Sequence, residues 1–229
     1  MQLITEYFKQ WCRDVARAEA LLTSNEYFLE GVLVLSCYIG ALARARFPQE
    51  TKDWKSYKNV VWEYSGQKNI YENIDLLFFC QWPSSKCAND KVYKCIKNHS
   101  ELASIFKSAF GGEDEIKSDP NKRYQKREKL ISSVKNKNSV WFDESNFQKH
   151  IELFSNNQIL YRFMRGEAVH NFDFPLFNAT YIPGDNKHTY TDNHQVSRDV
   201  ILATVKNIVG NMEKECLGKN KWPWELPCV

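Results

Sequence analysis

The residues best suited to chemistry lie close together near the end of the helical part of the chain, in the segment Tyr161–Asn171. Within it, Arg165 comes five positions before His170. Arginine stays charged and can bind a phosphate through two parallel hydrogen bonds. Histidine can take up and release a proton near neutral pH. The pair therefore suits cleavage of RNA by its own 2′-hydroxyl, with His170 moving the proton and Arg165 neutralising charge on the phosphate.

This reaction needs no metal ion, and it excludes DNA as a substrate because DNA lacks the attacking hydroxyl. On an ideal α-helix, however, residues five apart point roughly 140° away from each other and lie about 7.5 Å apart along the axis. The two side chains converge if the helix deforms, for which Gly166 is a weak point, or if a second subunit supplies one of them. A homodimer with both residues in the cleft between the subunits is the preferred solution. The alternative is an exposed arginine and a histidine at a helix C-terminus, where positive charge is favoured.

Length, composition and cysteine usage restrict the class of protein. The 229 residues are 43% hydrophobic, and no linker rich in Pro, Gly or Ser divides them, which favours a single domain spanning residues 1–229. The net charge of +3 is too small to indicate a nucleic-acid partner, although a local basic face stays open. The 7 cysteines are scattered and odd in number, which favours a reducing cytoplasm over a disulfide scaffold.

The most apolar stretch, Tyr27–Ala43, does not predict a membrane span. Its charge-free part, residues 31–43, has about thirteen residues, short of the roughly 20 that a spanning helix needs. We interpret it as the central helix of a bundle and expect no membrane partner. The N-terminus lacks a basic region followed by an apolar run, so we expect no signal peptide.

The spacing of apolar residues predicts an all-α fold. Helices are expected over residues 3–22, 23–46, 54–64, 70–79, 90–110, 121–134, from 143 onward, through the segment that bears Arg165 and His170, and over 196–217. Two aromatic and β-branched runs, residues 179–182 and 188–191, predict a small β-hairpin before the last helix. The tail, residues 222–224, is expected to dock on the domain.

An Arg-x4-His motif near the end of an all-helical domain resembles the signature of the HEPN superfamily, which comprises helical nucleotide-binding or RNase domains of microbial toxins, antiviral systems and some RNA-guided nucleases. Three further features agree with the resemblance: the long apolar helix Glu30–Phe47, the aromatic-rich stretch Leu160–Phe163, and Asn171 directly after the histidine. The resemblance is specific in the Arg-x4-His motif and only general in the arrangement of the helices. Many members carry a polar residue, commonly asparagine, directly after the arginine, where this chain has Gly166.

The resemblance implies a multi-helix HEPN-like bundle that acts as a metal-independent endoribonuclease of the toxin or antiviral-defence type, without a cofactor. It assigns catalysis to Arg165 and His170, with an antitoxin or a defence-system component as a partner. Glu167 and Asn171 could orient the histidine or the phosphate, and Arg162 could extend the row that binds phosphate. A surface ion pair of Glu167 and a surface role of Arg162 are the alternatives. The departure at Gly166 also leaves open a non-catalytic helical module that binds nucleotide, RNA or protein.

A basic segment is a second candidate for RNA binding. Its cations fall on the helix expected over residues 121–134, together with the aromatic residue Tyr124, and comprise Lys122, Arg123, Lys126 and Arg127. Basic residues with an aromatic ring suit the backbone and a stacked base of single-stranded RNA. The alternative is a solvated helix face.

A group of soft ligands within about twenty residues suggests zinc, and it comprises Cys80, Cys87, Cys95 and His99. The spacing lacks the tight pair of cysteines that is typical of structural zinc sites. A zinc-stabilised interaction protein is therefore the third and least favoured interpretation.

Overall fold

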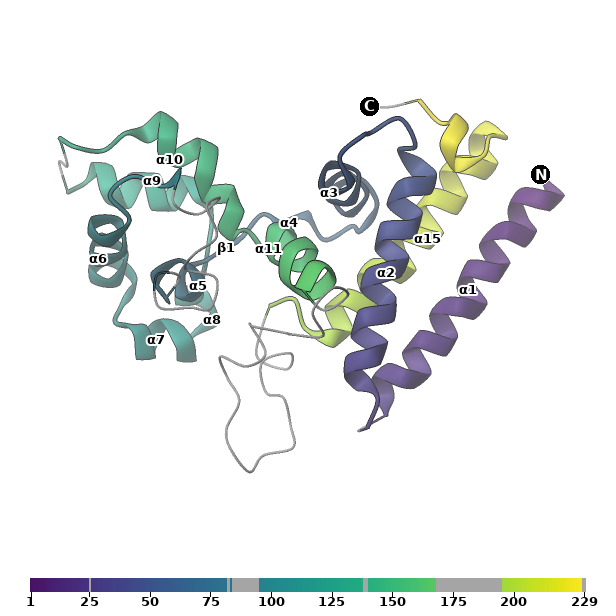
Figure 1. Cartoon of the computed structure of the whole chain (residues 1–229), viewed down its shortest axis with the longest axis horizontal. Coiled ribbons are helices and arrows are strands. Elements are labelled where there is room, and N and C mark those ends of the chain that lie inside the picture. Colours follow the sequence, from purple (N-terminus) through teal and green to yellow (C-terminus); the bar gives the residue numbers. More distant parts are fainter. Residues whose placement is uncertain (25, 82, 84–94, 138–139, 168–194, 228–229) are drawn as a thin grey trace. The chain divides into compact units, whose positions relative to one another are not determined.

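The computed structural model describes residues 1–24, 26–81, 83, 95–137, 140–167 and 195–227 (Figure 1). Their contacts group into two compact units, unit 1 with residues 1–71 and 160–229 and unit 2 with residues 72–159. The grouping describes contacts within one chain, so the expectation of a single domain over residues 1–229 stays a prediction.

Unit 1 is built on long helices that are close to those expected from the sequence. They are α1 (Gln2–Thr23), α2 (Phe28–Arg46), α3 (Asp53–Tyr64) and α15 (Arg198–Lys219). On α1 the buried residues Ile4, Phe8, Val15 and Leu22 recur at steps of four or seven, so they form one face of the helix. The short helix α4 (Lys68–Tyr71) follows Gly66, whose φ of +68° ends α3 with the left-handed backbone that glycine adopts easily.

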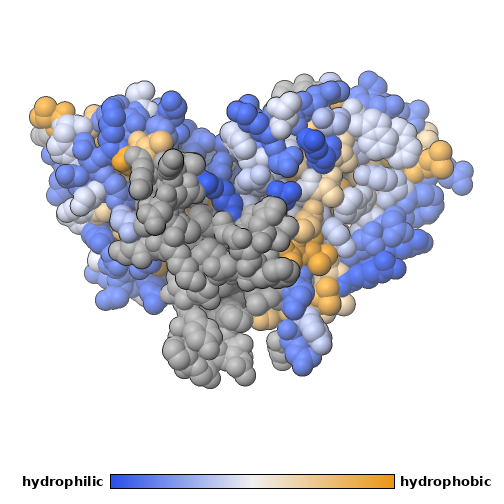
Figure 2. Space-filling view, viewed as in Figure 1, coloured by the Kyte–Doolittle hydropathy of each residue, from blue (hydrophilic) through white to orange (hydrophobic). Residues whose placement is uncertain are grey.

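Helix α2 is the central helix of unit 1, as its apolar sequence predicts. It packs against α1, α3, α15 and the segment η5 (Leu160–Glu167). Figure 2 shows hydrophobic residues along α2, beside a mostly hydrophilic outer face of α1. A Cβ on Gly31 would lie 2.7 Å from the backbone nitrogen of Leu22, so α1 and α2 approach each other closely there. None of the helices in the described residues combines the length and the apolar composition that crossing a bilayer requires.

The C-terminal tail docks on unit 1, as expected. It contains the short helix η6 (Pro223–Glu225), in which Pro223 is buried. The buried guanidinium of Arg46 donates hydrogen bonds to the carbonyls of Leu226, at 3.3 Å, and Pro227, at 2.8 Å. A buried cation thus fixes the backbone of the tail.

Unit 2 consists of short helices and one pair of strands. In chain order its elements are β1 (Ile74–Asp75), α5 (Leu76–Gln81), α6 (His99–Phe110), α7 (Glu113–Ser118), α8 (Pro120–Arg123), β2 (Tyr124–Gln125), α9 (Arg127–Lys135), α10 (Glu144–Ile151), η4 (Glu152–Phe154) and α11 (Asn156–Ile159). Strands β1 and β2 are antiparallel, with Ile74 opposite Gln125 and Asp75 opposite Tyr124. Asp143 accepts a hydrogen bond from the backbone nitrogen of Asn146 at 2.9 Å and caps α10, where a helix start was expected.

Several sequence-based boundaries are wrong. The helices expected over residues 70–79 and 121–134 are interrupted by β1 and β2, because these two segments pair with each other. Helix α7 lies between two of the expected helices, where no helix was predicted. The second helix begins at Phe28 rather than at residue 23, because α1 continues through Thr23, whose hydroxyl donates to the carbonyl of Ala20 at 3.0 Å. Helix α6 begins at His99, after Asn98 with its left-handed φ of +53°.

The fold class is confirmed, since the described part of the chain is all-α with one small antiparallel pair of strands. The hairpin expected over residues 179–191 lies outside the described residues.

Candidate functional site

Arg165 lies on η5, a helical segment with π geometry that follows directly after α11. In a π-helix each N–H bonds to the carbonyl five residues earlier. Such segments are rare in proteins, and those that occur often lie at functional sites. Residues five apart then lie about one turn apart, on nearly the same face, instead of roughly 140° apart as on an α-helix. The helix that carries the motif is therefore deformed through Glu167, in the sense that brings residues five apart together.

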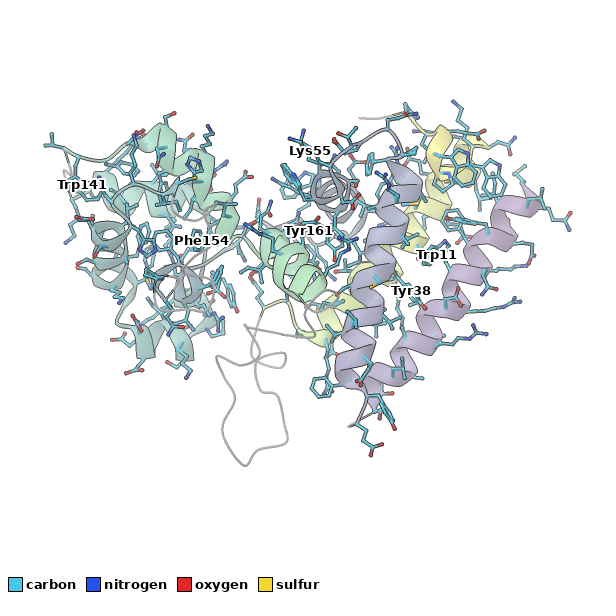
Figure 3. All side chains as sticks on the ribbon, in the orientation of Figure 1. Trp11, Tyr38, Lys55, Trp141, Phe154 and Tyr161 are labelled. Atoms are coloured by element: carbon cyan, nitrogen blue, oxygen red, sulfur yellow. The ribbon has the colours of Figure 1, made fainter. Side chains whose placement is uncertain are left out.

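Two tyrosine rings surround the guanidinium of Arg165. Its Cζ atom lies 5.4 Å from the ring centre of Tyr161, on η5, and 5.9 Å from that of Tyr57, on α3. The two rings are 5.2 Å apart and edge-to-face. Figure 3 shows Tyr161 on η5, which packs against α2 and α3. These cation–π contacts hold the half-buried guanidinium in place while leaving its N–H groups available.

Helix α2 contributes a glycine at the point where the Arg165 side chain passes. A Cβ on Gly40 would lie 2.9 Å from the Nε atom of Arg165, closer than a real side chain tolerates. The absence of a side chain at residue 40 therefore makes room for the arginine between α2 and the tyrosine rings.

Among the residues that the structure describes, the guanidinium of Arg165 contacts the two rings and has no carboxylate partner. Cys37 is exposed, but partial desolvation by its neighbours raises the pKa of its thiol, and the charge of Arg165 opposes this rise. Burial also raises the pKa of Tyr57 well above its ordinary value, again against the charge of Arg165. Both groups therefore stay protonated at neutral pH, so neither adds a charge beside the guanidinium.

Tyr57 has a hydroxyl that is buried without a hydrogen-bond partner in the described part of the chain. Leaving a buried hydroxyl unsatisfied costs about 1–3 kcal/mol. No pattern in the sequence points to Tyr57, because it lies on a different helix, far from the motif along the chain. It becomes a candidate only through its contact with Arg165.

Of the other candidate residues around the motif, the structure describes Arg162 in full and only the backbone of Glu167. His170 and Asn171 lie outside the described residues, and so does the side chain of Glu167. Arg162 is half-buried on η5. The pairing of Arg165 with His170 therefore stays a prediction.

The four RNA-binding candidates of the basic segment, Lys122, Arg123, Lys126 and Arg127, each pair with a carboxylate. Lys122 pairs with Glu115 and Lys126 pairs with Glu72. The Arg127 guanidinium lies 3.4 Å from Glu152. Arg123 is 5% exposed, and its Nη2 atom lies 2.7 Å from Asp75. The RNA-binding role of this segment stays a prediction, and Arg123 serves the interior of unit 2.

The zinc candidates do not converge within the described residues, which contain no cluster of three or more His, Cys, Asp or Glu side chains able to hold a metal ion. Burial raises the pKa of Cys80 to about 12, which disfavours the thiolate that zinc requires. The Nε2 atom of His99 lies 2.7 Å from the carbonyl of Phe79, and burial lowers the pKa of this histidine. Cys95 is exposed, and Cys87 lies outside the described residues.

The structure thus brings Arg165, Tyr161, Tyr57, Gly40 and Cys37 together in unit 1. A cation, a buried hydroxyl and two aromatic rings, with no competing carboxylate among the described residues, suit an anion with several oxygen acceptors, such as a phosphate group. No protein-family model, curated protein or solved structure matches the chain.

Proposed function

We propose that the protein is a metal-independent endoribonuclease in which Arg165 and His170 act on a phosphodiester of RNA. The observation that supports this most directly is a guanidinium held against two tyrosine rings, without a carboxylate among the described residues. In the proposed reaction His170 takes the proton of the attacking 2′-hydroxyl or donates one to the leaving 5′-oxygen. Arg165 stabilises the negative charge that develops on the phosphate oxygens. The products are a 2′,3′-cyclic phosphate, or its hydrolysed form, and a 5′-hydroxyl.

The π geometry of η5 supports the pairing of arginine and histidine. It removes, as far as Glu167, the angular separation that an α-helix imposes on residues five apart. The proposal requires that His170 lie on the same face as Arg165 or come from a second copy of the chain. A homodimer satisfies both arrangements, because it places two copies of each residue around one cleft.

The proposed setting is a toxin or antiviral-defence system in a reducing cytoplasm. Free cysteines support the reducing compartment, since Cys12, Cys37, Cys80, Cys95 and Cys216 are unbridged in the described part of the chain. An uncontrolled RNase is toxic, so an antitoxin or a trigger is the expected partner. This part of the proposal rests on the resemblance to the HEPN superfamily.

Cleavage of mixed RNA in the presence of EDTA tests the proposal. Wild type is expected to cleave, and His170→Ala is expected to lose roughly 100-fold or more in rate, because proton transfer by a positioned side chain contributes that much. Arg165→Ala is expected to lose activity to a similar degree. The matched controls are His150→Ala on α10 and Arg17→Ala on α1, both of which should cleave like wild type. Undiminished cleavage by His170→Ala, or loss of wild-type cleavage in EDTA, would contradict the proposal.

The second candidate function is a non-catalytic module that binds nucleotide, RNA or protein. Two observations favour it: Gly166 follows the arginine, and the groups gathered around Arg165 in the described residues are suited to holding an anion rather than to moving a proton at neutral pH. A folded protein that binds RNA through Arg165 and leaves it intact would identify this function. Light scattering on the same sample measures the oligomeric state.

A further inference from the structure

The hydroxyl of Tyr57 differs from those of the other buried tyrosines in the same unit. Tyr71 is hydrogen-bonded to Thr204 at 2.5 Å. Tyr64 accepts from Arg46 at 2.6 Å and donates to Glu215 at 2.5 Å. Tyr57 is 1% exposed, and its hydroxyl has no partner among the described residues. Buried polar atoms in native proteins nearly always have a partner, so this hydroxyl requires an explanation.

The neighbours of this hydroxyl indicate what a partner would be. The groups that influence it electrostatically are Arg165, Cys37, Tyr71 and Tyr161, and none of these is a carboxylate. Arg165 lies against the Tyr57 ring and is half-buried, whereas the tyrosine is enclosed. Of the two groups, the guanidinium is therefore the more exposed to an anion that arrives from solvent.

We infer that Tyr57 is a phosphate-binding residue, whose hydroxyl donates a hydrogen bond to the phosphate group that the Arg165 guanidinium binds. This inference rests on the proposed function, since it takes the ligand of Arg165 to be a phosphate. It adds a donor from α3 to a motif that lies on η5. A phosphate presents several acceptor oxygens, so it can accept from both groups at once.

The protonation of Tyr57 agrees with the role of a donor. Burial raises the pKa of this tyrosine well above its ordinary value, so it keeps its proton at neutral pH. Among the described residues, the site then combines the positive charge of Arg165 with a neutral donor, and no carboxylate there competes with the phosphate oxygens. A tyrosinate would repel the anion instead.

Tyr57→Phe tests the inference because it removes one oxygen atom and keeps the ring against Arg165. The probe is a short 2′-O-methyl RNA, which lacks the attacking hydroxyl and cannot be cleaved, with affinity measured by calorimetry. Tyr57→Phe is expected to bind roughly tenfold more weakly than wild type, the usual effect of losing a hydrogen bond to a charged group. Its melting temperature without ligand should equal or exceed that of wild type, because no protein hydrogen bond is lost. Arg165→Ala should weaken binding at least as much.

The matched control is Tyr71→Phe, which removes a buried hydroxyl that is hydrogen-bonded to Thr204 in the same unit. It is expected to melt at a lower temperature and to bind the probe like wild type. A double variant, Tyr57→Phe with Arg165→Ala, should lose less than the sum of the two single losses in binding free energy, because both groups hold one phosphate.

The outcomes separate this inference from the nuclease proposal. Wild-type affinity in Tyr57→Phe overturns the inference even if His170→Ala abolishes cleavage. A lowered melting temperature or failure to fold also overturns it, because the hydroxyl would then have a partner within the protein. If wild type does not cleave RNA but binds the probe through Tyr57 and Arg165, the inference is supported and the nuclease proposal is wrong. Inorganic phosphate is tested alone to determine whether a free phosphate ion binds at this site. Phosphate binding that is weakened by both Tyr57→Phe and Arg165→Ala supports the inference.

Discussion

At the scale of single residues, the position of Arg165 depends on a glycine in α2, which has no side chain to block the arginine. Gly40 is the residue of α2 whose missing side chain leaves space for the guanidinium of the arginine. The guanidinium also contacts two tyrosine rings, that of Tyr57 on α3 and that of Tyr161 on η5. Each contributor is an ordinary residue, and the site results from their convergence on one charged group.

Gly40→Ala is expected to weaken binding of 2′-O-methyl RNA by about tenfold, because the new methyl group displaces a donor that contacts the phosphate. The fold should persist, since alanine favours a helix over glycine by about 1 kcal/mol and a side chain can move aside. Calorimetry and thermal melting measure the two effects. Gly210→Ala on α15 is the matched control, because a Cβ there meets nothing within 4 Å. It should melt at a higher temperature than wild type and bind normally, and equal binding by both variants would show that Gly40 does not position Arg165.

At the scale of secondary-structure elements, the paired strands of unit 2 depend on a buried ion pair. Arg123, at the end of α8, donates from Nε and Nη2 to Asp75 at 3.0 Å and 2.7 Å. Asp75 also accepts from the backbone nitrogen of Phe78 at 3.1 Å, which caps the start of α5. One carboxylate thus fixes β1, α5 and the β2 segment together.

Arg123→Met is expected to destabilise the protein by about 3–5 kcal/mol, because it leaves the Asp75 carboxylate buried without its partner. Urea denaturation followed by circular dichroism measures the loss. The neighbouring variant Lys122→Met breaks an exposed ion pair with Glu115 and should leave stability nearly unchanged. Equal stability of the two variants would mean that the Arg123–Asp75 pair does not support unit 2. Weakened RNA binding by a fully folded Arg123→Met would instead favour a direct role of this arginine in RNA contact.

At the scale of the whole molecule, unit 2 is a continuous segment whose two ends meet. The backbone nitrogen of Asn156 donates to the carbonyl of Asn73 at 2.9 Å, and Ile74 forms an isolated antiparallel bridge with Ser155. Its interior is aromatic, with Phe79, Phe106, Phe147 and Phe154 all buried. These are the features of a segment that carries its own core.

The fragment of residues 72–159 is therefore expected to fold without the rest of the chain. It should show helical circular dichroism and a cooperative thermal transition. A fragment of residues 77–153, which lacks both strand pairing at β1 and the contacts of the chain ends, serves as the control and should be largely unfolded. If the fragment of residues 72–159 lacks a cooperative transition, unit 2 depends on unit 1 for its stability, as the expectation of a single domain implies.

The sequence by itself determined the elements whose signals are local. The spacing of apolar residues on α1, the uniformly apolar α2, the Asp143 cap of α10 and the helical end of the chain were all readable in advance, because each depends on neighbours within a few residues. Arg165 was also found from sequence, as a cation within a motif. Its partner His170 stays a prediction outside the described residues.

Only the tertiary structure decided the features that join distant segments. Strands β1 and β2 interrupt two expected helices because their hydrogen bonds and the Arg123–Asp75 pair come from residues far apart in the chain. The cations of the basic segment face carboxylates for the same reason. Tyr57 and Gly40 meet Arg165 through the packing of α2, α3 and η5, which no local pattern encodes. Periodicity records which face of a helix is buried, whereas the identity of the groups buried together is a property of the folded chain.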